Sequence, residues 1–495
     1  MKTTLTRILA AFLLAVMLIS AVACAETPAE QGTEPVANTT VAGEGGNTPA
    51  ETVPEETAVN AENILGLRDL NGETVTFFSR LYNGTWESDL FVDDLDGTVL
   101  NDAIYTRNAT ISEKYGVQFE EIESGALTFR EQVANRIASG DTSYQVLYMG
   151  LADAANAAQS GYLQDMTDIE NINLGGQWWT QSSNKSWSIG NRQYFATGAI
   201  TTVDDRAIRT MYFNKDMIEN LQLTTIYDLV DNNEWVYEKF FEYVEAAKQD
   251  DGDGVSTLSD IYGASAQVTF GFMMTMASGE MLTQKDADDI PTLVATDNTR
   301  FIDVVTYLTD KVANNTGIYL GADQDIRDLF GNGQSLFWAE VLQHAQTMRQ
   351  NYNLNFGIIP MPKYNAEQEN YHQYTTGYCC TVVCFPTTTV GDALDVASFV
   401  VEAMAIESVE TVTPAYYDIC LKGRYVDDVD SAVMLDIITT SVSSDYAEIL
   451  SWGGFKDAVQ SAISSGVAIA SVIKGNGTLT KKAIQKSIDS FQKLP

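Results

Sequence analysis

The chain alternates short β-branched runs with longer stretches whose apolar residues recur at helical spacing. Strand-like runs and helical stretches take turns at residues 74–78, 100–115, 117–122, 128–138 and 144–149. A run of apolar residues every two positions indicates a strand, and a spacing of three to four indicates a helix. This order of elements predicts a parallel, doubly wound sheet that is covered by helices.

A second alternating set follows Gly198. Strands are predicted at residues 208–213, 335–338, 356–360 and 378–385. Helices are predicted at residues 236–247, 302–312 and 324–330, and again over the last 45 residues. No repeat of 20 to 50 residues is visible, so a solenoid is not expected. The pattern predicts an α/β protein with a second sheet.

The N-terminus has the zones of an export signal. Lys2 and Arg7 precede an apolar run at residues 8–19, which small residues extend up to Cys24. We predict a signal peptide at residues 1–23, so the protein is expected to work outside the cytoplasm. The apolar run is too short to predict a retained transmembrane helix.

Cys24 follows Ala21-Val22-Ala23, and this run resembles a bacterial lipobox, whose cysteine is acylated. Ordinary cleavage after Ala23, with free secretion, is the alternative. Residues 24–62 are acidic, contain no Lys or Arg, and are rich in Thr, Pro, Gly and Asn. Such a segment cannot bury enough apolar surface to fold. We therefore predict a lipid-anchored, disordered acidic linker at residues 24–62.

Charge and cysteine content narrow the classes of partner. The chain has 67 acidic and 29 basic residues, a formal net charge of −38, so nucleic acid is not an expected partner. Neutral or cationic ligands are easier to accommodate, although acidity also serves solubility. Cys379, Cys380 and Cys384 lie in an apolar segment and are interpreted as small core residues. A disulfide to Cys420 is the alternative.

Residues 249–260 resemble a calcium loop. The oxygen ligands would come from Asp251, Asp253, the carbonyl of Val255 and Asp260. The first position carries an amide where the pattern has Asp, and the last carries Asp in place of Glu. One hypothesis is a structural calcium ion, and the other is a plain acidic turn. No other cofactor is expected.

Several phrases together resemble one protein family. They lie at residues 101–108, 144–150, 161–168, 211–215 and 356–362, and the likeness spans residues 70–490. These phrases are similar to those of bacterial extracellular solute-binding proteins of family 1, typified by maltose-binding protein. Each phrase is weak alone, but their order and spacing are specific.

The resemblance implies a two-lobe periplasmic-binding-protein type II fold that hands a ligand to an ABC importer. Hinges would lie near residues 194–202 and 356–362, with a third crossing within 421–433. Ligand binding would close the lobes. The N-terminal lobe would contain residues 63–198 and 363–425, and the C-terminal lobe residues 199–362 and 426–495.

A cleft for sugars needs flat aromatic faces for the apolar side of the ring and polar groups for the hydroxyls. The candidates are chosen by position in the chain and by the resemblance. They are Arg80, Trp86, Trp178, Trp179, Asp204, Phe270, Trp338 and Trp452. For each aromatic residue packing is the alternative, and for Asp204 it is helix capping.

The absence of two common catalytic motifs argues against an enzyme. No His-Glu-x-x-His or Gly-x-Ser-x-Gly sequence is present. We therefore predict no enzyme but a monomeric, carbohydrate-binding component of an ABC importer, with an oligosaccharide as ligand and permease subunits as partners. A secreted glycan hydrolase needs only two carboxylates and is one alternative. A lipid-anchored glycan sensor or scavenger is the other.

Overall fold

A computed structural model describes most of the chain, at residues 59–81, 89–125, 128–417, 421–422 and 429–494. The predicted signal peptide, Cys24 and almost all of the acidic linker lie outside the described residues, as do Trp86 and Cys420. In this part of the chain, no helix combines the length and the hydrophobicity that crossing a membrane requires.

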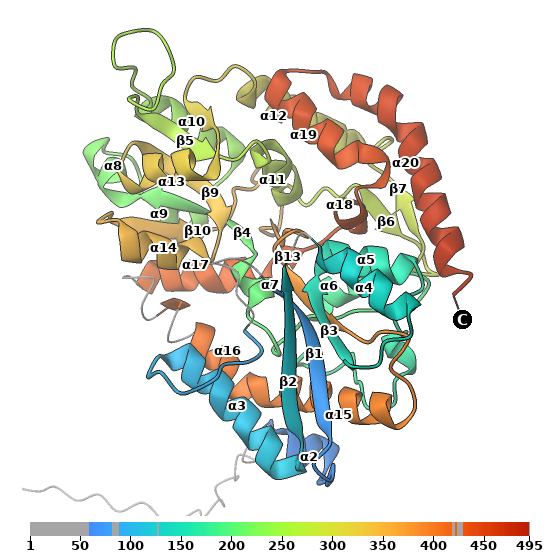
Figure 1. The fold of residues 1–495 in the computed structure, drawn as a ribbon. Helices are drawn as coiled ribbons and strands as arrows, with labels where there is room; N and C mark the ends of the chain where they lie inside the picture. Colours follow the sequence, from blue (N-terminus) through green and yellow to red (C-terminus); the bar gives the residue numbers. More distant parts are fainter. Residues whose placement is uncertain (1–58, 82–88, 126–127, 418–420, 423–428, 495) are drawn as a thin grey trace, which may run out of the picture. The chain divides into compact units, whose positions relative to one another are not determined.

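The first sheet has the strand order β12-β3-β1-β2 (Figure 1). Its strands are β1 (Thr74–Leu81), β2 (Gln118–Gly125), β3 (Val146–Gly150) and β12 (Thr381–Cys384). Strand β1 pairs in parallel with β2 and β3, and β12 pairs antiparallel with β3. The connecting helices are α3 (Val99–Tyr115), α4 (Phe129–Ala138) and α5 (Leu151–Gln159). The predicted order of strands and helices in this region is confirmed.

Helix α3 shows how the sequence sets an element boundary. Ile104, Ile111 and Tyr115 lie on its buried face. Gly116 ends the helix in the left-handed region, with φ 63°, and its N–H bonds the carbonyl of Ser112. A Cβ on Gly116 would also come within 2.9 Å of an Asp69 carboxylate oxygen. Glycine therefore suits this position for both conformation and space.

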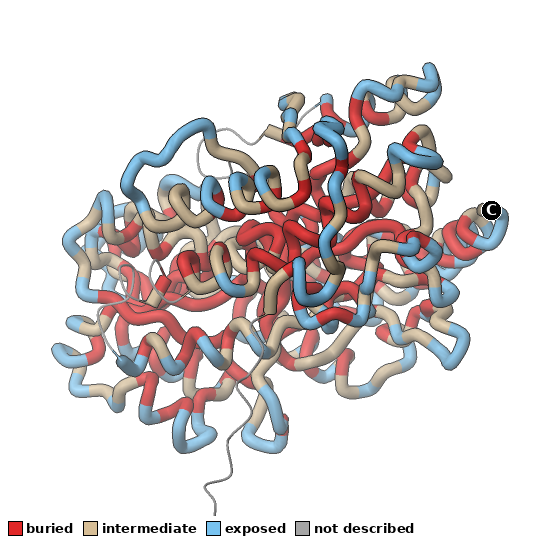
Figure 2. Tube along the Cα trace, turned by 90° about the horizontal axis from the view of Figure 1, so that it is seen from below, coloured by how far each residue is buried: buried red, intermediate tan, exposed pale blue. Residues whose placement is uncertain are grey.

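The second sheet has the order β10-β4-β9-β5-β8. Its strands are β4 (Arg209–Asn214), β5 (Tyr262–Ala266), β8 (Ile318–Leu320), β9 (Ser335–Val341) and β10 (Phe356–Ile359). Strand β5 is parallel to β8 and β9, whereas β4 is antiparallel to β9 and β10. All residues of β3, β4, β5, β9, β10 and β12 are buried, whereas no residue of β2 is. The buried parts of the chain lie in the interior of the body (Figure 2).

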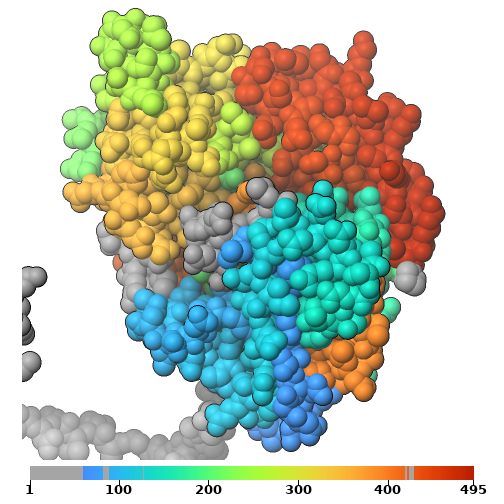
Figure 3. All heavy atoms as spheres, in the orientation of Figure 1, coloured from blue at the N-terminus to red at the C-terminus, as the bar shows by residue number. Residues whose placement is uncertain are grey.

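Helices cover the second sheet and make up much of the remaining described chain. The longer ones are α10 (Tyr237–Ala247), α11 (Phe270–Ala277), α12 (Thr299–Val312), α13 (Asp323–Gly331), α14 (His344–Asn351), α15 (Asp392–Glu410), α17 (Val429–Thr440), α19 (Phe455–Ser465) and α20 (Ile469–Phe491). Helix α20 contacts α19, and it also contacts α5 beside the first sheet (Figure 3). The predicted helical C-terminus is confirmed.

Short elements complete the connections. The short helices are α2 (Ala61–Leu65), η1 (Met166–Asp168), α6 (Gln181–Trp187), α7 (Val203–Arg206), α8 (Lys215–Asn220), α9 (Ile226–Asp231), α16 (Val412–Pro414), α18 (Tyr446–Leu450) and η3 (Trp452–Gly454). The short strands pair as β6 (Thr283–Lys285) with β7 (Pro291–Leu293), and β11 (Gln373–Tyr374) with β13 (Val442–Ser443).

Two crossing segments, residues 196–208 and 375–383, run between the sheets. An antiparallel bridge joins Ala196 to Val383 at the first sheet, and another joins Ile208 to Thr375 next to the second. The first segment overlaps the hinge expected at residues 194–202. The second differs from the one expected at 356–362, because β10 is a strand of the second sheet and Lys363 still bonds Trp235 there.

Two further differences concern the start of the body and the cysteines. The predicted linker extends to residue 62, but Ala61 is already fully buried at the start of α2. The N–H of Ala61 donates to Glu407 at 3.0 Å, so Ala61 and Glu62 belong to the folded body. Cys379, Cys380 and Cys384 are buried free thiols, which confirms their interpretation as core residues.

Candidate functional site

Polar side chains gather where the parallel strands of both sheets end. Ligands of open α/β sheets bind at the carboxyl ends of the strands, because there the loops leave a crevice. We call this group the inter-sheet cluster. Its members are Arg80 of β1, Asp153 at the start of α5, Arg209 of β4, Gln267 after β5, Asp323 at the start of α13, Glu340 of β9, and Tyr378 and Cys379 in the second crossing segment.

An arginine and a carboxylate form the first-sheet side of this cluster. A guanidinium nitrogen of Arg80 lies 3.7 Å from an Asp153 carboxylate oxygen, and both side chains are largely covered. The same guanidinium lies 5.6 Å from the ring centre of Tyr378. Burial raises the pKa of Asp153, while Arg80 and Arg130 oppose the rise. The pair therefore keeps two desolvated charges balanced.

The second-sheet side is a chain of hydrogen bonds. Arg209 donates to the Glu340 carboxylate through Nη1 and to Gln267 Oε1 at 3.3 Å through Nη2. Gln267 in turn donates to Asp323 at 2.8 Å. Burial raises the pKa of Glu340, and Arg209 opposes that rise. The register places Arg209 and Glu340 together, because Thr210 pairs with Glu340 and Arg209 with Val341.

Cys379 lies where the two sides meet. Burial raises the pKa of its thiol to about 12, while Arg209 and Arg80 lower it and Glu340 raises it. Charged groups of both sheets thus surround one residue of a crossing segment. Guanidinium groups offer donors and the carboxylates and amide offer acceptors. Two guanidinium groups face three carboxylates, because Asp323 is bonded by the neutral Gln267 amide. Such a set can hydrogen-bond a neutral, polyhydroxylated molecule.

A comparison with protein families shows which family this chain belongs to. A model described as bacterial extracellular solute-binding protein matches residues 108–407, more than half of the chain. The chain belongs to this family. A comparison with curated proteins finds no match. Membership places this solute-binding protein among extracellular binding proteins, and it confirms the resemblance that the sequence phrases indicated.

Solved structures show the same fold as this solute-binding protein. A cyclo/maltodextrin-binding protein complexed with maltotetraose is 13% identical, with TM-score 0.54, covering 85% of this chain and 96% of that one. UspC of M. tuberculosis is 12% identical, with TM-score 0.53 and coverages of 83% and 100%. An ABC substrate-binding protein from Listeria monocytogenes in complex with cycloalternan is 12% identical, with TM-score 0.50 and coverages of 85% and 98%. The fold is thus the two-lobed α/β fold of periplasmic binding proteins.

Of the residues predicted from the sequence of this solute-binding protein, the structure places Arg80 in the inter-sheet cluster. Asp204 lies elsewhere, on α7, where burial and Asp205 raise its pKa well above the usual range. Trp86 lies outside the described residues. A ligand-binding role for Arg80 and Asp204 stays a prediction.

Trp178 and Trp179 are held by one carboxylate. Both indole N–H groups donate to Glu402 of α15, at 2.8 and 3.0 Å, and both rings belong to the core beside the first sheet. Gly198 packs against their backbone so closely that a Cβ there would lie 2.2 Å from the Trp178 carbonyl oxygen. The pair fixes the start of the first crossing segment. The same two residues line a small pocket of about 210 Å³ together with Asp204.

The other three predicted aromatic residues have packing positions in this structure. Trp338 is 1% exposed, and its ring centre lies 5.5 Å from that of Phe330 and 5.1 Å from that of Tyr212. Phe270 is fully buried, 5.8 Å from Phe240 between ring centres. Trp452 is also buried, and its indole N–H donates to Ser487 at 2.8 Å. Hydrophobic burial is sufficient to explain the positions of Phe270 and Trp452. The indole N–H of Trp338 is buried and has no hydrogen-bond partner among the described residues. A ligand-binding role for the three stays a prediction.

The sequence missed several members of the inter-sheet cluster, namely Asp153, Arg209, Gln267, Asp323, Glu340 and Tyr378. A signal for three of them was available. Arg209 is the second residue of a predicted strand, Glu340 follows another closely, and Asp323 precedes a predicted helix. Charged residues at such ends are candidates once the strand order is known, because parallel strands end at one edge.

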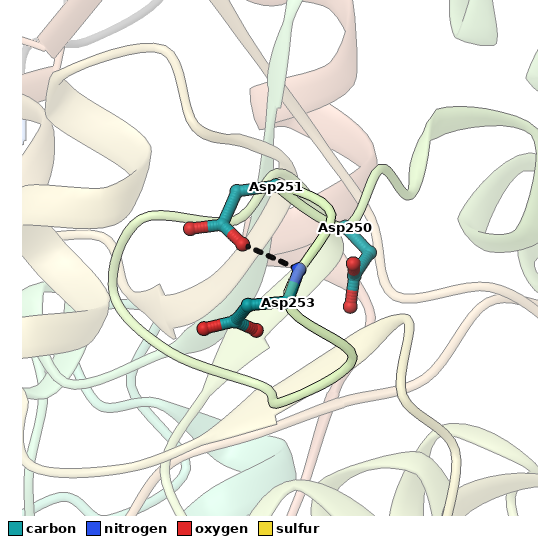
Figure 4. Close-up of side chains that lie close together, drawn as sticks. All are labelled: Asp250, Asp251 and Asp253. Carbon is teal, nitrogen blue, oxygen red and sulfur yellow. Dashed lines mark hydrogen bonds between the residues drawn. The ribbon is translucent and has the colours of Figure 1, made fainter.

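In the predicted calcium loop, the carboxylates that lie close together are not the set that the sequence predicted. Carboxylate oxygens of Asp250, Asp251 and Asp253 lie within 4.8 Å of one another on an exposed turn (Figure 4). Asp260 instead accepts backbone N–H groups of Asp251 and Thr257, at 2.9 and 2.8 Å, which lowers its pKa.

The backbone of the same loop also uses its carboxylates. Val255 is exposed, and its N–H donates to Asp253 at 2.7 Å. Asp250, which the sequence prediction left out, accepts the N–H groups of Gly252 and Gly254. The loop is therefore shaped by carboxylate-to-backbone hydrogen bonds, which are typical of Asx turns.

Proposed function

We propose that this protein is the extracellular substrate-binding component of an ABC importer and that it captures an oligosaccharide between its lobes without changing it chemically. The single observation that carries the proposal is the inter-sheet cluster. There, Arg80 with Asp153 and Arg209 with Glu340 form two balanced pairs at facing strand ends. Two of the similar structures are complexes with maltotetraose and cycloalternan, which are oligosaccharides, and this supports the choice of ligand.

The cluster suits a neutral ligand better than an anionic one. Each guanidinium group is already compensated by a carboxylate, so a ligand carboxylate would add an unbalanced charge in a desolvated site. Sugar hydroxyls both donate and accept, so they match guanidinium donors and carboxylate acceptors at the same time. Tyr378 is 69% exposed and offers a ring face for the apolar side of a sugar.

The positions of the cluster residues on both sheets predict that the lobes close when a ligand binds. Arg80 of β1 and Asp153 of α5 lie at the first sheet, and Arg209 of β4, Glu340 of β9 and Gln267, which follows β5, lie at the second. A ligand that bonds both sides is bound fully only when the lobes approach each other. Its differential affinity then favours the closed population.

The membrane and partner assignments are part of the same proposal. Acylation of Cys24 would hold the protein, as a monomer, at the outer face of the cell membrane beside permease subunits. The sequence of residues 21–24 and the acidic segment after it support a lipid anchor. Mass spectrometry of the membrane fraction tests this, since acylated Cys24 would be the N-terminus. A soluble product that begins at Cys24 without lipid would contradict it.

Calcium at the acidic turn is proposed as structural and separate from sugar capture. The three exposed carboxylates of Asp250, Asp251 and Asp253 support it, because oxygen ligands are those that calcium prefers.

Isothermal titration calorimetry against neutral maltodextrins, cyclic glucans and other oligosaccharides tests the main proposal. We expect at least one of them to bind with 1:1 stoichiometry. Chromatography of the bound sugar after prolonged incubation should show it intact. Release of new reducing ends would show a glycan hydrolase, and a preference for charged ligands over every neutral sugar would contradict the role assigned to the balanced pairs.

A further inference from the structure

A pocket of about 210 Å³ lies beside the first crossing segment, and it shares no lining residue with the inter-sheet cluster. Trp178, Trp179 and Thr180 form one part of its wall, and Asp204 and Asp205 of α7 another. Typical ligand sites for drug-sized molecules measure about 300–1,000 Å³, so this pocket suits a smaller guest.

Asp204 is the unusual residue of this pocket. The side chain is 8% exposed, and Thr180 donates to Oδ2 only at 3.4 Å. Among the described residues, no donor makes a hydrogen bond of normal geometry to Oδ1, although the nearby Thr197 hydroxyl lowers the pKa. A buried carboxylate with so few and such long hydrogen bonds is costly, so such a group takes up a proton or a cation.

The neighbouring charges leave Asp204 without a counter-charge of its own. Asp89 accepts hydrogen bonds from Tyr148, Thr201 and Thr202 and is the charge that acts on buried Arg107. Asp205 is opposed by the adjacent Arg206. Arg107 is thus assigned to Asp89 and Arg206 to Asp205. Neither of these two arginines of the described chain is left as a counter-charge for Asp204.

Every other element around the pocket adds negative or neutral groups. Helix α15 contributes Glu402, whose carboxylate accepts the two indole N–H groups. Tyr417, which follows α16, and Cys380 in the second crossing segment are neutral near pH 7, because burial raises the pKa of both. The negative surplus is therefore local to the pocket.

We propose that this pocket binds one small monovalent cation, an ammonium group or an alkali ion, with the Asp204 carboxylate as its counter-charge. Asp205 and the Thr180 hydroxyl supply further oxygen atoms, and the two Trp residues supply an apolar wall. Aromatic walls and carboxylates together are suited to ammonium groups. The site is distinct from the inter-sheet cluster and does not depend on the ligand proposed for it.

A proton competes with the cation for the same carboxylate. Burial raises the pKa of Asp204 well above its usual range, and burial together with Asp89 raises that of Asp205 to about 6. A protonated carboxylate needs no cation as its counter-charge. The affinity for a cation must therefore rise as the pH increases from 5 to 8.

Thermal unfolding in chloride salts at constant ionic strength tests this site. Potassium, sodium and methylammonium chloride distinguish an alkali ion from an ammonium group, and tetrabutylammonium chloride is too bulky for the pocket and sets the baseline. We expect one small cation to raise Tm by a few degrees in a saturable way at pH 8 and much less at pH 5. Asp204→Asn should remove the cation effect, and Asp303→Asn on the exposed side of α12 should keep it.

Two results would overturn the proposal. One is an equal Tm in all four salts at pH 8, and the other is a cation effect that survives in Asp204→Asn. If Asp204→Asn unfolds, the Asp205→Asn variant is used, which should weaken cation binding at least several-fold. A wild-type Tm that depends on pH but on no cation would show that the pocket holds only a proton. Sugar binding is measured separately, so it can fail or succeed independently.

Discussion

Tyr378 is the residue whose substitution most directly tests ligand stacking. Its side chain is 69% exposed, so Tyr378→Ala should leave the fold intact. Loss of a stacking face should weaken sugar binding by about 1 kcal/mol, or roughly fivefold in Kd. Calorimetry with the tightest sugar measures this change. Tyr378→Phe keeps the ring at the same position, so it is the matched control and should bind normally; equal affinity in both variants would exclude stacking on Tyr378.

Glu402 makes a testable contribution to stability. Its carboxylate accepts the indole N–H groups of Trp178 and Trp179 and the backbone N–H of Asn173. Glu402→Gln leaves one acceptor atom for these donors, so the free energy of unfolding should fall by about 1–3 kcal/mol. Urea denaturation measures it. Glu410→Gln, exposed at the end of the same helix, should cost far less, and a similar loss in both would refute the role of the shared carboxylate.

The sequence located some residues and missed others for physical reasons. Arg80 was predicted because it follows the first predicted strand, where the resemblance implies ligand contacts. Trp338, Phe270 and Trp452 were candidates as aromatic residues, but composition cannot tell a ring in the core from a ring in a cleft. Tyr378 was missed because its exposure depends on where the second crossing segment leaves the core.

At the scale of elements, the acidic turn between α10 and β5 yields a further prediction. If calcium binds Asp250, Asp251 and Asp253, millimolar calcium should raise Tm by a few degrees, because the ion binds the folded state. Asp253→Asn should abolish the rise, whereas Asp303→Asn should retain it. Differential scanning fluorimetry with calcium and with magnesium is the measurement. No rise in the wild type would leave a plain acidic turn.

Most strands and helices were predictable, and the crossing segments were only partly so. Runs such as Thr74–Phe78 and Ile208–Phe213 have the β-branched and aromatic character that favours strands. Residues 356–360 have it too, and the structure shows a strand there. Local pattern could not reveal that this strand pairs with β4 inside the second sheet, because pairing is set by contacts distant in sequence.

For the whole molecule, we expect sugar binding to reduce the radius of gyration as the lobes close. Small-angle X-ray scattering with and without the ligand identified by calorimetry measures this change.

Gly198→Ala should disturb the first crossing segment, because its Cβ would lie 2.2 Å from the Trp178 carbonyl oxygen. The variant should be less stable by about 1–3 kcal/mol. Gly125→Ala, where a Cβ meets nothing within 4 Å, is the control.

The attachment of α2 has a mechanical consequence. Lys114 of α3 lies 3.6 Å from Glu62 and 3.5 Å from Glu407 of α15, and the N–H of Ala61 donates to the same Glu407. The chain therefore enters the body through elements packed on the first sheet alone. If Cys24 is acylated as proposed, a pull from the membrane would act on the first lobe alone, and the second lobe would still be able to rotate about the crossing segments.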